Sequence, residues 1–109
     1  MNFKIVYTDH FEREFKRLAK KYRSIKYDLA NLLNQLQENP TNGTPLGKDC
    51  YKVRLAISAK QKGKSAGARV ITHLHIQGKT IFLLSIYDKS EQESISDNEI
   101  SAILNQIRQ

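Results

Sequence analysis

The fold is decided by residues 51–87, YKVRLAISAKQKGKSAGARVITHLHIQGKTIFLLSIY. Apolar and polar side chains alternate over residues 51–58, which predicts a half-buried strand with its cations on one face. The small and basic residues 59–68 predict a flexible loop. Residues 69–76 resume as a strand, and a tight turn leads into residues 80–87, whose nearly continuous apolar run predicts a central strand buried on both faces.

The sequence before this stretch predicts a short strand followed by a pair of helices. Residues 3–7 alternate in polarity, and Thr8 or Asp9 then offers a side-chain oxygen that can cap a helix. Apolar residues recur at helical spacing after this cap, and again in a second helix from Ile25. The second helix is expected to stop before Pro40, because a proline disfavours helical geometry in the residue before it.

The remaining segments complete one domain. Residues 40–49, PTNGTPLGKD, contain both prolines and two glycines and predict a turn-rich loop. Ser96 or Asp97 is expected to cap a C-terminal amphipathic helix that reaches Ile107. The order β-α-α-β-β-β-α predicts an α+β fold, with a helical hairpin packed on a small, mainly antiparallel sheet. The chain has 109 residues without a repeat or a composition break, so residues 1–109 are expected to form a single domain.

The sequence favours a cytoplasmic protein that needs no metal or cofactor. No apolar run approaches the roughly 18 residues of a membrane span, and the N-terminal segment lacks the apolar core of a signal peptide. The single cysteine, Cys50, fits a reducing compartment and is interpreted as a small core residue. His73 and His75 share one face of a strand without an evident third ligand, so a structural role is favoured over metal binding.

Positive charge is concentrated in the strand-forming region. The chain carries 18 Lys+Arg and 11 Asp+Glu, a net charge of +7, and residues 50–87 contain no carboxylate. A field this one-sided attracts polyanions, of which nucleic acid is the commonest in the cytosol, although a lysine-rich solubilising face is the alternative. The cations of this region are Lys52, Arg54, Lys60, Lys62, Lys64, Arg69 and Lys79.

Such a cluster suits a phosphodiester, because arginine offers a bidentate and permanently charged fork to phosphate oxygens. RNA carries its own nucleophile in the 2′-hydroxyl, so cleavage requires only proton transfer and stabilisation of the charge on phosphorus. A lysine among other cations has its pKa lowered toward the range of a base. Tyr87 ends the apolar strand and could position the sugar, stack on a base, share in proton transfer or simply complete the core.

Three stretches of the chain resemble the RelE/ParE superfamily of bacterial toxin–antitoxin toxins, and most closely its HigB-like, RelE-type members. They are residues 51–54 (YKVR), 62–71 (KGKSAGARVI) and 86–91 (IYDKSE), and Ala66 stands where family members are expected to have glycine. The resemblance implies a metal-independent endoribonuclease that cleaves mRNA in the decoding (30S A) site of the ribosome and leaves a cyclic phosphate. It also implies neutralisation by a cognate antitoxin protein, and the free toxin is expected to be a monomer.

The resemblance also implies roles for individual residues. Arg54 and Arg69 would hold the scissile phosphate, and Lys62 or Lys64 would hold the backbone or act as base. Glu91 is expected to orient Lys89 through an ion pair. The predicted catalytic residues are Arg54, Lys64, Arg69, Tyr87 and Lys89, and the predicted RNA-binding residues are Lys52, Lys60 and Lys62.

Two other functions are compatible with the sequence. One is a ParE-like toxin that poisons gyrase, a branch of the same superfamily that shares the fold and lacks the cationic site. The other is a non-catalytic RNA-binding or ribosome-binding module, because binding and cleavage use the same residue types.

Overall fold

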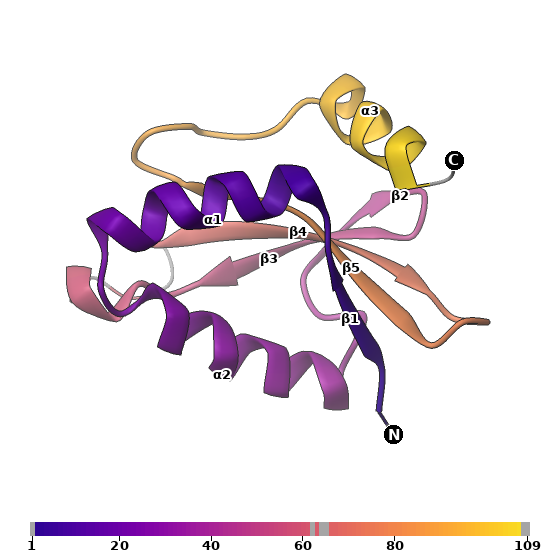
Figure 1. Ribbon diagram of the computed structural model, residues 1–109, viewed down its shortest axis with the longest axis horizontal. Helices are drawn as coiled ribbons and strands as arrows, with labels where there is room; N and C mark the ends of the chain where they lie inside the picture. The colour runs from indigo at the N-terminus through magenta and orange to yellow at the C-terminus, as the bar shows by residue number, and fades with distance from the viewer. Residues whose placement is uncertain (1, 62, 64–65, 108–109) are drawn as a thin grey trace.

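The computed structural model describes residues 2–61, 63 and 66–107, and within them one sheet of five strands carries three α-helices (Figure 1). None of these helices has the length and apolar character that a membrane span requires. The elements in chain order are β1 (Lys4–Tyr7), α1 (Asp9–Lys21), α2 (Ile25–Glu38), β2 (Thr44–Gly47), β3 (Cys50–Leu55), a 3-10 turn η1 (Ser58–Lys60), β4 (Ala68–His75), β5 (Thr80–Asp88) and α3 (Asp97–Ile107).

The strands lie in the order β1-β5-β4-β3-β2. The first strand, β1, pairs parallel with the last strand, β5, and the other three pairings are antiparallel. The predicted α+β fold with a mainly antiparallel sheet is therefore confirmed. As expected, β5 is covered on both faces, because Leu83 and Ile86 belong to one buried cluster and Leu84 and Tyr87 to the other.

The edge strand β2 was not expected, and the prediction of a loop over residues 40–49 is wrong at this point. Thr44–Gly47 pair antiparallel with β3 despite Pro45, and an edge strand tolerates proline because one side of it has no strand to bond. Gly43 makes the turn into β2 possible. Its φ is +108°, and a Cβ there would lie 2.4 Å from the carbonyl oxygen of Lys52.

Helices α1 and α2 cover one face of the sheet (Figure 1). The side chain of Thr8 caps α1 by accepting a hydrogen bond from the Phe11 amide, as expected, and α2 ends at Glu38, before Pro40. Beyond the end of β1, α1 also supplies partners to the open edge of β5, where the Glu14 carboxylate accepts from the Ile86 amide at 3.2 Å. The buried residues of this face are Phe11, Leu18, Ile25, Leu29, Leu32, Leu36, Val53, Leu55, Ile57, Ala68, Val70, Leu74, Ile81, Leu83 and Ile86.

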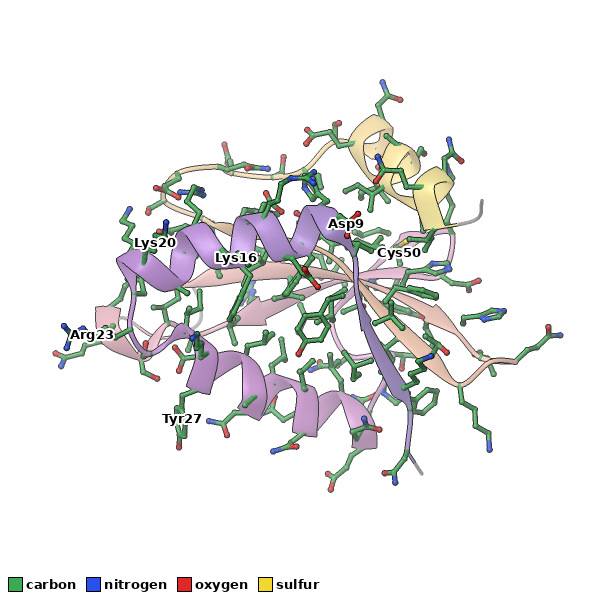
Figure 2. All side chains as sticks on the ribbon, viewed as in Figure 1. Asp9, Lys16, Lys20, Arg23, Tyr27 and Cys50 are labelled. Carbon is green, nitrogen blue, oxygen red and sulfur yellow. The ribbon has the colours of Figure 1, made fainter. Side chains whose placement is uncertain are left out.

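Helix α3 covers a second buried cluster on the opposite face. A long segment, residues 89–96, leads from β5 to α3 and is drawn in orange in Figure 1. Cys50 belongs to this second cluster and lies on the α3 side of the sheet (Figure 2), which confirms its interpretation as a core residue. The other buried members are Ile71, Leu84, Tyr87, Ile100, Ile103 and Leu104.

Candidate functional site

Three predicted site residues form one row across the sheet. Arg54 of β3 pairs in register with Arg69 of β4, and Arg69 pairs with Tyr87 of β5. Directly opposed residues of antiparallel strands project from the same face, with Cβ atoms about 4.5–5.5 Å apart. Lys52, two residues before Arg54, projects from that face as well. The sheet thus brings together side chains that are up to 35 residues apart in the chain.

The cations of this row line a hollow of about 410 Å³. Strands β2, β3 and β4 form its floor, and the segment that follows β5 forms one wall. Arg54 and Lys89 are exposed, Lys52 is half-buried, and Arg69 is only 5% exposed. Such a concave cationic surface fits a phosphate group. The lining residues are Thr44, Lys52, Arg54, Arg69, Lys89, Glu93 and Ser94.

A family model described as "RelE toxin of RelE / RelB toxin-antitoxin system" matches residues 8–107 of the chain. The chain belongs to the RelE toxin family. The match spans nearly all of the sequence, from the cap of α1 to the end of α3, and so includes every residue that lines the hollow. No curated protein matches by sequence.

The fold of this RelE-family chain is also that of solved toxin structures. An arginine-to-alanine double mutant of E. coli toxin RelE in the free state matches with a TM-score of 0.63 and 20% identity, covering 98% of this chain and 99% of that chain. The toxin in the intact E. coli RelBE toxin–antitoxin complex matches with a TM-score of 0.63 and 19% identity, covering 80% and 96%. The double mutant in complex with a peptide of the antitoxin RelB gives 0.62 and 20%, covering 89% and 98%.

The predicted site residues differ in whether they line the hollow. Lys52, Arg54, Arg69 and Lys89 line the same hollow, and their predicted roles stay predictions. Lys62 and Lys64, the proposed loop cations, fall outside the described residues.

Lys60 does not line the hollow but a neighbouring pocket that it shares with Lys89, and its ammonium group is engaged within the protein. Its ammonium group donates to Asp88 Oδ1 at 2.7 Å and to the Ala66 carbonyl at 3.1 Å, and its side chain is 13% exposed. Burial alone would lower the pKa of Lys60, but the hydrogen bond and charge of Asp88 outweigh it and raise the pKa. The geometry therefore supports a structural role for Lys60, and its predicted contact with RNA stays a prediction.

Asp88 is the centre of a buried polar cluster at the end of β5. Its side chain is fully buried and accepts hydrogen bonds from the hydroxyl of Tyr22 at 2.6 Å, from Lys60, and from the amide and hydroxyl of Ser90. Burial alone would raise the pKa of Asp88, but these donors hold it well below its usual range. The cluster ties α1, η1 and β5 together next to the cationic hollow.

Glu91 does not pair with Lys89, and that expectation is wrong. Its carboxylate instead binds Arg17 at 3.1 Å and Lys21 at 3.1 Å on α1. The hydrogen bonds from Arg17 and Lys21 lower the pKa of Glu91, and the hydrogen bond to Glu91 raises the pKa of Lys21. The contact holds the beginning of the segment between β5 and α3 against α1, and Lys89 lines the hollow.

Tyr87 is the cross-strand neighbour of Arg69 but does not line the hollow. The side chain is 1% exposed, belongs to the buried cluster under α3, and its hydroxyl has no hydrogen-bond partner among the described residues. Burial raises the pKa of the Tyr87 hydroxyl, although the charge of Arg69 opposes the shift. In this structure the Tyr87 hydroxyl is buried and is not part of the lining of the hollow, and the catalytic role of Tyr87 stays a prediction.

The carboxylate pKa shifts predict a loss of stability in acid. Asp88 and Glu91 have lowered pKa values in the folded chain, so their stabilising effect is complete above the unfolded values of about 3.9 and 4.3 and is lost as the pH falls below them. We expect the denaturant midpoint to be constant between about pH 5 and 8 and to fall from pH 5 to 2. An Asp88→Asn variant should show a weaker fall, and an equally steep fall would exclude Asp88 as its main source.

Two features of this region were not predicted from the sequence. The burial of Asp88 could not be predicted, because the sequence shows only that it follows an apolar strand. Glu93 reaches the hollow only because residues 89–96 fold back along it, and irregular segments carry no periodicity from which their path could be predicted. No group of three or more His, Cys, Asp or Glu side chains among residues 2–61, 63 and 66–107 is arranged to hold a metal ion.

Proposed function

We propose that this chain is the toxin of a type II toxin–antitoxin system and acts as a ribosome-dependent, metal-independent endoribonuclease on mRNA. The single observation that carries the proposal is the hollow into which β3, β4 and the segment after β5 each place cations. The membership of the chain in the RelE toxin family supports the same substrate and reaction.

The geometry suggests separate roles for the cations that line the hollow. Arg54 is exposed and can form a bidentate contact with the scissile phosphate, and Arg69 adds a second fixed charge from the neighbouring strand. Lys52 and Lys89 flank the two arginines and can contact neighbouring phosphates. Positive groups held in place in this way stabilise the charge that grows on phosphorus in the transition state.

A cognate antitoxin is the proposed protein partner. The E. coli RelE toxin of the same fold forms a complex with its antitoxin. The net charge of +7 favours an antitoxin segment with acidic side chains over the cationic face, because complementary potentials speed and orient association.

The test is induction of the chain in a bacterial host, followed by mapping of the 5′ ends of a reporter transcript. A second transcript with a blocked ribosome-binding site serves as the control. Cuts confined to the translated transcript are the expected result. Cuts in both transcripts would contradict ribosome dependence. Growth arrest with intact transcripts would favour a protein target such as gyrase, and transcript binding without cuts would favour a non-catalytic RNA-binding module.

A further inference from the structure

Glu93 is the one carboxylate among the described residues that line the cationic hollow. It shares this lining with Lys52 and Arg54 of β3, Arg69 of β4, and Lys89, while β2 contributes the uncharged Thr44. An acidic side chain weakens the attraction of a cationic surface for phosphate. Its presence in the lining of such a surface therefore calls for a chemical explanation.

The segment that carries Glu93 is anchored on both sides of it. The amides of Glu91 and Gln92 both donate to the Asp88 carbonyl at 3.0 Å, and the Gln92 side chain donates to the Ser94 carbonyl at 2.9 Å. Beyond Ser94, Ile95 packs against the buried cluster under α3. These contacts hold the backbone of Glu93 at the rim of the hollow, and its side chain is exposed to an incoming ligand.

Cleavage of RNA through its 2′-hydroxyl needs a base within reach of the phosphate. The arginines of the hollow cannot serve, because guanidinium groups stay protonated in proteins. Tyr87 cannot serve either, because its hydroxyl is buried and burial raises its pKa. A lysine becomes a base only after its pKa falls by several units, whereas a glutamate is already ionised at neutral pH.

We propose that Glu93 is the general base of the cleavage reaction, an inference that rests on the proposed nuclease function. The Glu93 carboxylate takes the proton of the 2′-hydroxyl, and the 2′-oxygen forms a bond to phosphorus. The bond from phosphorus to the 5′-oxygen then breaks, and a lysine ammonium group of the hollow donates a proton to this leaving oxygen. The products are a 2′,3′-cyclic phosphate and a 5′-hydroxyl end, and no water or cofactor is consumed.

The proposal makes a prediction that a purely electrostatic role does not share. If Glu93 only weakened the attraction for phosphate, its removal would strengthen RNA binding and speed cleavage. As a general base it contributes a factor of about 10²–10⁴ to the rate of the chemical step. Glu93→Gln should therefore bind programmed ribosomes as tightly as the unaltered chain, or more tightly, and cleave at least about 100-fold more slowly.

The experiment measures single-turnover cleavage of a short message on programmed ribosomes, with the purified chain in excess and at a series of concentrations. The maximal rate reports the chemical step, and the half-saturating concentration reports binding. Glu93→Asp should retain part of the rate, because it keeps the carboxylate. Glu38→Gln, at the exposed end of α2, removes the same charge away from the hollow and should leave both quantities unchanged.

The outcomes separate this proposal from the nuclease function itself. A Glu93→Gln chain that cleaves as fast as the unaltered chain, or faster, would overturn the base role and leave the nuclease function standing. An unaltered chain that binds programmed ribosomes without cutting the message would overturn the nuclease function, and the base role with it. A slow Glu93→Gln chain with unchanged binding and partial activity of Glu93→Asp would establish the base.

Discussion

Arg54→Ala is expected to lower the rate of mRNA cleavage by a factor of about 10²–10³, the usual effect of removing one group that stabilises transition-state charge. Arg54 is exposed on β3, so its loss should leave the fold intact. Arg69 is 5% exposed, and replacing it would also disturb the packing over Tyr87. Arg54 is therefore the sharper test of phosphate binding in the hollow.

The measurement is again single-turnover cleavage on programmed ribosomes. Arg54→Lys should have an intermediate effect, because lysine keeps the charge and loses the bidentate fork. Arg23→Ala removes an exposed arginine that projects away from the body of the molecule (Figure 2), and it should cleave at the normal rate. Equal rates for Arg54→Ala and Arg23→Ala would show that the hollow does not bind the scissile phosphate.

Asp88→Ala is expected to destabilise the fold by about 3–5 kcal/mol, the usual effect of removing one partner from a buried ion pair. The fully buried carboxylate of Asp88 neutralises Lys60, whose side chain is 13% exposed, and it also accepts a hydrogen bond from Tyr22. Its loss would leave a charge and a hydroxyl without their partner. The free energy of unfolding in urea measures the effect.

Two further variants separate the buried pair from the exposed charges beside it. Asp88→Ala combined with Lys60→Met should be more stable than Asp88→Ala alone, because the unpaired ammonium group is removed with its partner. Glu91→Gln breaks only exposed pairs and should cost less than about 1 kcal/mol. If Asp88→Ala costs no more than Glu91→Gln, the buried cluster does not hold α1, η1 and β5 together.

The sequence was most informative where side-chain periodicity reflects burial. Alternation over residues 51–58 predicted β3, which ends at Leu55, and the common face of Lys52 and Arg54. The apolar run of residues 80–87 predicted β5, an interior strand of the sheet. The short strand β2 was missed because its proline and glycine are typical of loops, and only pairing with β3 makes the segment extended.

The candidate site was predicted in part for the same reason. The two arginines meet because strand pairing sets their register, which the meander of β3, β4 and β5 makes predictable. The ion pair between Lys60 and Asp88 could not be predicted, because the 3-10 turn that brings Lys60 to Asp88 has no apolar pattern. Burial of Tyr87 depends on α3 folding back over β5, a contact that the spacing of residues within α3 does not specify.

The pairing of β1 with β5 has a consequence for the order in which the chain can fold during its synthesis. Lys4 lies opposite Thr80, so β1 can pair only after β5 has been synthesised. Contacts between residues so distant in the chain form slowly. Lys89 and Glu93 follow β5 and emerge from the ribosome later still. The hollow that Lys89 and Glu93 line can therefore form only after β5 has been synthesised and has paired with β4.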